Sequence, residues 1–196
     1  MTKPAKHSAN WCSAFCNANG IDIHYLRTGR GRPPLVALHG LIGSGACLSP
    51  LARALEGKFD VLLPDARGHG QTSAPPRGYL YPDFAADVVG LIGALRLRAP
   101  ILVGHSMGGM TAAVVAAHTD ASLSALVLLD PTFIGPDWQR EVYESDVAAE
   151  HKRLRASTRD DLLIQARTRS PDRSDELLGF LTDARLQTSL SAFEVL

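Results

Sequence analysis

Residues 101–117 read ILVGHSMGGMTAAVVAA, and the prediction of the fold starts from this segment. A short, β-rich apolar run meets an Ala-rich run of helical length across Gly104-His105-Ser106-Met107-Gly108. The G-x-S-x-G pattern alone is weak, but its place at a predicted strand-to-helix turn is informative. A serine on such a turn has a strained backbone, and flanking glycines let neighbouring chain pass where a Cβ would clash. We therefore predict that Ser106 is a nucleophile held above a sheet, where the next helix stabilises negative charge on a substrate.

Short apolar runs alternate with helical patterns on both sides of this motif. The strand-like runs are 35–38, 61–63, 101–103 and 126–129, and the helical patterns are 48–55, 84–97 and 107–117. Apolar runs without polar alternation are typical of strands covered on both faces. The rhythm predicts an α/β fold with a doubly wound, mostly parallel sheet. A half-exposed edge strand is expected at 21–26, joined through Asn19-Gly20 in a hairpin with the segment around Phe15.

The composition changes near Gly135-Pro136. Sixteen of the 17 glycines precede residue 136, whereas 21 of the 40 charged residues lie in the last 61 positions. The later segment has amphipathic helical patterns, with a helix start expected at Ser157 and a break between helices at Ser170-Pro171. We therefore predict a core of residues 1–135 that contains the first six strands, followed by a helical cap segment of residues 136–196.

The overall composition is that of an ordinary globular protein. Twenty basic and 20 acidic side chains leave no net charge to attract a polyanion, so no nucleic-acid partner is expected. The polar start MTKPAKHSAN lacks the apolar stretch of a secretory signal, which favours a cytoplasmic location. Residues 99–117 are uncharged over the length of a membrane span, but their central glycines, histidine and serine argue against lipid. Cys12, Cys16 and Cys47 have no metal-binding spacing, and no metal or organic cofactor is expected.

A second motif, His39-Gly40-Leu41-Ile42-Gly43, follows the apolar run at 35–38. Acyl transfer needs two backbone N–H donors, one after the nucleophile and one from the loop after a neighbouring strand. Leu41 and Met107 are the matching positions. We expect their N–H groups to form an oxyanion hole, with His39 and Gly40 beside the substrate.

Asp130 follows the last strand-like run, at the point where the chain leaves the predicted sheet above Ser106. We expect Phe133, Trp138 and Leu41 to line an apolar, water-poor pocket beneath the cap. Asp130 is also a candidate catalytic acid. The alternative is that it braces the turn that it begins.

A third, Gly-rich motif runs from Asp65 to Ser73 and reads DARGHGQTS, which we interpret as a tight connection braced by an Asp–Arg contact. The order and spacing of the three motifs resemble those of the α/β-hydrolase superfamily over residues 20 to 135. The chain is most similar to the branch with small helical caps, which holds esterases, carbon–carbon bond hydrolases and cofactor-free haloperoxidases. The resemblance implies that Ser106 is the nucleophile, that Leu41 and Met107 form the oxyanion hole, and that the segment from residue 136 is the cap.

In this family the catalytic residues follow in the order serine, acid, histidine. Only His118 and His151 follow Ser106. His118 lies roughly 18 Å along the same predicted helix, and His151 is expected to be a solvated residue on a charged helix. His39 and His69 lie at the correct sheet edge, but the resemblance gives neither a proton-transfer role. We therefore expect about 70 to 100 residues, with the last core strands and the catalytic histidine, to be absent from this chain.

These residues predict a serine hydrolase that cleaves a small or medium, mostly apolar ester, lactone or activated ketone through an acyl-enzyme at Ser106. Two alternatives stay open: a non-catalytic ligand-binding protein on the same fold, and a cofactor-free perhydrolase with the same nucleophile. The expected partner is a small molecule, and no membrane partner is expected. Because absent core strands would leave the run at 126–129 at the sheet edge, self-association through this edge is also expected.

Overall fold

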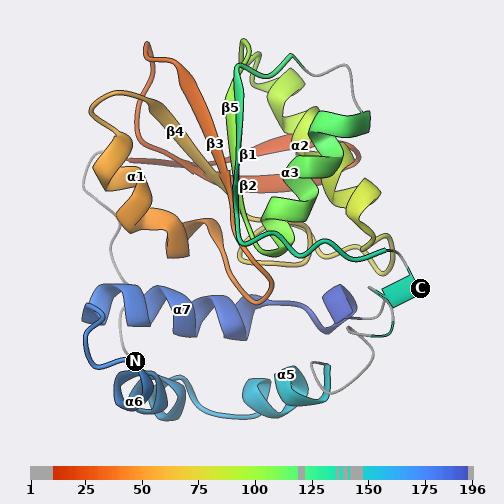
Figure 1. Ribbon diagram of the computed structural model, residues 1–196. Coiled ribbons are helices and arrows are strands. Elements are labelled where there is room, and N and C mark those ends of the chain that lie inside the picture. Colours follow the sequence, from red (N-terminus) through yellow and green to blue (C-terminus); the bar gives the residue numbers. More distant parts are fainter. Residues whose placement is uncertain (1–10, 119–121, 136, 139–140, 142–147, 194–196) are drawn as a thin grey trace.

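The computed structural model describes residues 11–118, 122–135, 137–138, 141 and 148–193 (Figure 1). The strands are β1 (Cys12–Ala18), β2 (Ile21–Arg27), β3 (Pro34–Leu38), β4 (Asp60–Pro64), β5 (Ile101–His105) and β6 (Ala125–Leu129). The α-helices are α1 (Ser49–Leu55), α2 (Tyr81–Ala94), α3 (Met107–His118), α5 (Ala148–Arg155), α6 (Arg159–Arg169) and α7 (Asp175–Gln187). Two short 3₁₀ helices are η1 (Gly45–Leu48) and η3 (Leu190–Phe193).

The strands form one sheet in the order β1-β2-β4-β3-β5-β6. β1 and β2 pair antiparallel, β2 pairs antiparallel with β4, and the remaining neighbours are parallel. Asn19 and Gly20 join the hairpin with φ angles of 50° and 76°. Positive φ at both central positions is the geometry of a type I′ turn, which an Asn-Gly pair favours. The predicted hairpin and the mostly parallel sheet are therefore confirmed.

Alternate residues of the central strands point to opposite faces of the sheet. Val36 and Leu38 of β3 pack in a buried cluster with α2 and α3, whereas Leu35 and Ala37 pack in a second cluster with α1. Figure 1 shows α1 on one face and α2 with α3 on the other. Both faces of the strands are thus covered, which explains their continuous apolar runs and confirms the doubly wound arrangement.

The uncharged stretch at 99–117 contains β5, a turn and α3 rather than one continuous helix. The glycines at the turn interrupt this stretch, and its first part pairs with β3 and β6 as strand β5. Among the described residues, no helix is both long enough and apolar enough to cross a membrane.

Helices α5, α6 and α7 lie together on one side of the sheet, with α7 between the sheet and the other two (Figure 1). Thr158 caps α6 and Ser174 caps α7, each by accepting a backbone N–H in the first turn. The expected helix start at Ser157 is therefore one residue early, and the break at Ser170-Pro171 is confirmed. The predicted domain boundary falls partly outside the described residues.

The C-terminal helices are attached to the core at several points. Ser189 N–H donates to the Gly68 carbonyl at 2.7 Å, and Arg53 of α1 makes two contacts of 2.6 Å with Glu176 of α7. Phe193 is buried in an apolar cluster that includes Met107. The helical segment is thus packed directly against the loops that carry the predicted site.

Candidate active site

Ser106 lies at the turn between β5 and α3, as the sequence predicts. Its φ angle is 52°, a left-handed conformation that costs a non-glycine residue about 1–3 kcal/mol. Two hydrogen bonds fix the turn: Ser106 N–H donates to the Leu129 carbonyl and Met110 N–H donates to the Ser106 carbonyl, both at 3.0 Å. The strained backbone is therefore held by β6 on one side and by the first turn of α3 on the other.

The glycines around Ser106 are required by close backbone contacts. A Cβ on Gly104 would lie 2.2 Å from the Gly108 carbonyl oxygen, and a Cβ on Gly108 would lie 2.5 Å from the Leu38 carbonyl oxygen. Any larger residue at either position would force the strand and the helix apart. The G-x-S-x-G pattern therefore has a direct steric cause in this fold.

The loop after β3 passes close to Ser106. A Cβ on Gly40 would lie 3.2 Å from Ser106 Cβ, so glycine lets this loop approach the serine. Gly43 N–H donates to the Gly40 carbonyl at 3.0 Å, which closes a tight turn around Leu41. Met107 is the first residue of α3, and its N–H therefore has no acceptor within the helix. Gly40 and Ser106 therefore lie against each other in the structure. The two predicted oxyanion residues, Leu41 and Met107, directly follow them in the sequence.

The hydroxyl of Ser106 has a partner that the sequence analysis missed. Ser106 Oγ lies 3.1 Å from Thr132 Oγ1, and Thr132 N–H donates to the Ser106 carbonyl at 3.3 Å. Asp130, the candidate acid, directly follows β6 and has a φ angle of 46° and an exposed side chain. Thr132 lies two residues after Asp130 in the sequence. Because β6 pairs with β5, the turn after β6 lies next to Ser106, so the hydroxyl of Thr132 was the feature of the sequence that could have identified this partner.

His39 is buried, and both of its ring nitrogens are used in structural hydrogen bonds. Nε2 accepts the Ala66 N–H at 3.0 Å, so Nδ1 carries the proton and donates to the Gly40 carbonyl at 2.8 Å. Burial lowers the pKa of His39, which keeps the ring neutral. The ring therefore connects the loop after β3 to the loop after β4.

The expectation of a solvated His151 is wrong. Its side chain is fully buried, Nε2 donates to the Thr188 carbonyl at 3.0 Å, and its ring centroid lies 4.5 Å from that of Phe193. Burial lowers the pKa of His151. The charged neighbours of His151 on α5 face solvent. The histidine itself is covered by η3, which contributes Phe193. Among the described residues, no histidine hydrogen-bonds Ser106 Oγ.

The predicted Asp–Arg contact of the Gly-rich motif forms with a different aspartate. Arg67 makes two contacts of 2.6 Å with Asp87 of α2, and both side chains are buried. Asp65 instead accepts a hydrogen bond from His24 Nδ1 at 2.8 Å. The interpretation of the motif as a braced connection holds, but Asp65 and Arg67 point in different directions and brace different elements.

A model of the family described as alpha/beta hydrolase fold matches residues 33–174. The chain belongs to the alpha/beta hydrolase family. Several curated proteins that resemble it are hydrolases. 2-(Acetamidomethylene)succinate hydrolase of Mesorhizobium japonicum is 34% identical over 125 residues, which cover 64% of this chain and 45% of that protein. Serine hydrolase BPHL of Homo sapiens is 33% identical over 150 residues, which cover 73% of this chain and 52% of BPHL.

Solved structures share the fold of this alpha/beta hydrolase. The crystal structure of E-2-(acetamidomethylene)succinate hydrolase matches with a TM-score of 0.77 at 24% identity, over 93% of this chain and 70% of that chain. The chain spans about half the length of the two curated relatives.

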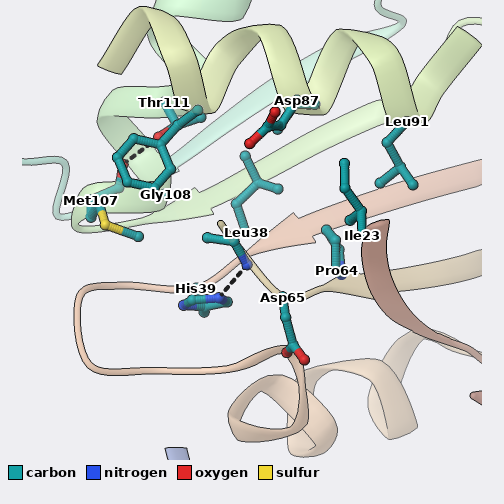
Figure 2. A pocket seen from close by; sticks show the side chains of 13 residues that line it. Ile23, Leu38, His39, Pro64, Asp65, Asp87, Leu91, Met107, Gly108 and Thr111 are labelled. Atoms are coloured by element: carbon teal, nitrogen blue, oxygen red, sulfur yellow. Dashed lines mark hydrogen bonds between the residues drawn. The ribbon is translucent and has the colours of Figure 1, made fainter. Parts of the chain in front are cut away.

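The chain has a small cavity that Met107 and Gly108 of α3 border on one side (Figure 2). It encloses about 30 Å³ between the sheet and helices α2 and α3, and Leu38, Met107, Gly108 and Asp87 are among its walls. A substrate pocket needs about 300 Å³ or more, whereas this volume holds at most a water molecule or two. The cavity is therefore a feature of the core. Among the described residues, no three His, Cys, Asp or Glu side chains are grouped as metal ligands.

The predicted pocket residues have different environments. Phe133 and Trp138 are 62% and 57% exposed, and Leu41 is half-buried. Ile134, which the sequence analysis did not select, takes the buried place beside Met107 in the apolar cluster. The structure thus brings Leu41 and Met107 into one cluster and leaves the two aromatic side chains at the surface.

Proposed function

We propose that this alpha/beta hydrolase is a serine hydrolase that cleaves a small or medium, mostly apolar ester, lactone or activated ketone. The observation that carries the proposal is the left-handed φ of 52° at Ser106, at a strand-to-helix turn bounded by obligatory glycines. Backbone strain at a polar residue is typical of a functional position. The name of the human relative, a serine hydrolase, is consistent with this nucleophile.

In the proposed reaction, Ser106 Oγ attacks the acyl carbon while its proton passes to a general base. The N–H groups of Leu41 and Met107 donate to the oxyanion that develops on the acyl oxygen. The leaving group departs with a proton from the base, and water then releases the acyl group from Ser106. The tight turn at Gly40 and the start of α3 support the oxyanion role.

Helices α5 to α7 are the cap in this proposal. The support is one apolar cluster that contains Phe193 and Met107 and against which Leu41 packs. The aromatic side chains of Phe133 and Trp138 then supply the apolar wall on the open side. Their exposure of more than half fits residues that become covered when substrate binds.

The general base is the missing part of the described site, since the partner of Ser106 Oγ is Thr132. An unassisted serine is a poor nucleophile at neutral pH, so we expect this 196-residue chain to turn esters over slowly. Added imidazole is expected to raise the acylation rate of Ser106, because it supplies a base to an otherwise assembled serine and oxyanion hole.

The test is a fluorophosphonate probe followed by mapping of the modified peptide, with and without imidazole. The expected adduct lies on Ser106, grows faster with imidazole and disappears in Ser106→Ala. Thr132→Val is the matched variant, because it removes the serine's hydroxyl partner but keeps the shape. It is expected to retain labelling at Ser106. An unmodified Ser106 at all imidazole concentrations would reject the hydrolase proposal and favour the ligand-binding alternative.

A further inference from the structure

Three side chains that make no hydrogen bond to Ser106 form a continuous hydrogen-bonded series. Ser13 Oγ of β1 lies 2.8 Å from His24 Nε2 of β2, and His24 Nδ1 lies 2.8 Å from Asp65 Oδ2. Two strands separate β2 from β5 in the sheet, and about four strand spacings of 4.8 Å separate β1 from β5. The series is therefore a cluster distinct from the candidate active site.

With a neutral His24 ring, the hydrogen-bond partners assign the proton positions in this series. An ionised carboxylate only accepts, so His24 Nδ1 carries the proton that it donates to Asp65. Nε2 is then bare and accepts the hydroxyl proton of Ser13. A nucleophile that donates to a base, with the base oriented by a third group, is the arrangement of an activated serine.

Asp65 is held in its orienting role by the surrounding backbone. Oδ1 accepts the Gly45 N–H at 2.7 Å and Oδ2 accepts the Gln71 N–H at 2.9 Å. Burial raises the pKa of the Asp65 carboxyl, but the hydrogen bonds from His24 and Gln71 outweigh it and keep the pKa below its ordinary value. A Cβ at residue 70 would lie 2.1 Å from Oδ2, so Gly70 leaves room for the carboxylate.

Burial separates the roles of the three residues. His24 and Asp65 are 3% and 4% exposed, whereas Ser13 is exposed on the edge strand. The base and its orienting carboxylate are thus shielded from water, while the hydroxyl is open to reagents in solution. This is the distribution that nucleophilic chemistry needs, and a histidine satisfied only for core packing does not require an exposed serine as its partner.

We propose that Ser13, His24 and Asp65 form a second nucleophilic site, which accepts acyl or phosphonyl groups from small activated esters independently of Ser106. Ser13 Oγ forms the bond to the acyl carbon and its proton moves to His24 Nε2. The leaving group then takes that proton as its bond to the acyl carbon breaks. Water, activated by the same nitrogen, later hydrolyses the Ser13 ester and restores the hydroxyl.

Two neighbours define what the second site accepts. The side-chain amide nitrogen of Gln71 lies 3.5 Å from His24 Nε2, the nitrogen that Ser13 Oγ also contacts, and we infer that it donates to a developing oxyanion. The ring of Phe15 is 58% exposed, and its centroid lies 5.1 Å from that of His24. A compact ester with an aromatic or short alkyl group fits this open, partly apolar surface.

The first experiment uses a fluorophosphonate probe on the Ser106→Ala variant of the full chain. The expected adduct lies on Ser13, forms without imidazole and disappears when Ser13→Ala is added. Ser124, an exposed serine near the opposite edge of the sheet, is the internal control and is expected to stay unmodified. Because imidazole dependence distinguishes the two sites, failure of labelling at Ser106 does not affect the result at Ser13.

A second experiment avoids variants of the buried residues, which risk unfolding. In Ser13→Cys the new thiol faces His24, whereas the exposed Cys12 beside it points to the other face of the strand. A thiol next to an imidazole has a lowered pKa, so its alkylation by iodoacetamide at pH 6 is expected to be at least about 10-fold faster than that of Cys12. An unmodified Ser13 in Ser106→Ala, or equal alkylation rates for the two thiols, would overturn the proposal.

Discussion

His69 provides a quantitative test of the packing between the core and the C-terminal helices. Its ring is fully buried, and Nδ1 donates to the Arg67 carbonyl at 2.8 Å. Burial, with a smaller contribution from the nearby His39 ring, lowers the pKa of His69 to about 3, although the Arg67 carbonyl and Asp65 partly oppose this shift. The imidazolium form of His69 is therefore excluded from the folded protein at any mildly acidic pH.

The direction of the pH effect on stability follows from the difference between the pKa of His69 in the folded protein and its pKa in the unfolded chain. In the unfolded chain, histidine titrates near pH 6.5, as in model peptides. As the pH falls below about 6.5, the unfolded state binds a proton that folded His69 does not bind until about pH 3. The folded state therefore loses stability over this window. Between pH 7 and pH 5, the loss from this one residue is about 2 kcal/mol.

The assay is urea unfolding, followed by tryptophan fluorescence at pH 7 and at pH 5, for the wild type and His69→Leu. The leucine variant loses the hydrogen bond to Arg67 at both pH values, so that cost cancels in the pH difference. We expect the wild type to lose about 2 kcal/mol more than the variant between the two pH values. The exposed His118→Gln is the control and is expected to behave as the wild type. The same pH dependence in the wild type and in His69→Leu would refute the argument.

Three further predictions test the serine turn, the buried ion pair and the sheet edge. Gly108→Ala forces a Cβ against a backbone carbonyl oxygen and is expected to cost about 3 kcal/mol in urea unfolding; a loss below about 1 kcal/mol would contradict the steric reading. Asp87→Ala leaves a buried guanidinium unpaired and is expected to cost about 3–5 kcal/mol, whereas Arg153→Ala, in an exposed pair, is expected to cost less than about 1 kcal/mol. We propose that the exposed β6 edge self-associates, so Val127→Lys is expected to shift the mass measured by light scattering toward the monomer, while Ile164→Lys on α6 leaves it unchanged. Equal masses for the two lysine variants would remove β6 as the contact.

The parts of the fold that the sequence predicts well are those encoded by local chemistry. Asn19-Gly20 specifies its turn because few other pairs accept two positive φ angles, and the hairpin follows from it. The glycines around Ser106 likewise specify a close crossing of backbone segments. Each of these signals is contained within a few residues of the chain, so no knowledge of distant partners is needed.

The predictions that failed concern the choice of a distant partner. Arg67 follows Asp65 by two residues, but its guanidinium reaches Asp87 on α2, and sequence spacing cannot distinguish the two carboxylates. His151 has charged neighbours on its own helix, yet it is buried because Phe193 returns to cover it. In both cases the environment is set by an element that the side chain meets only after the chain has folded.

The Gly-rich loop from Asp65 to Ser73 joins the separate parts of the molecule. It contacts the β1–β2 hairpin through His24, α2 through Asp87, the loop after β3 through His39, and the C-terminal segment through Ser189. Each of these contacts uses a different residue of the loop and points in a different direction. This explains why the motif is dense in glycine, since four elements must approach one short segment. It also means that the serine turn and the helices above it share a support, so a change in the loop is expected to affect both.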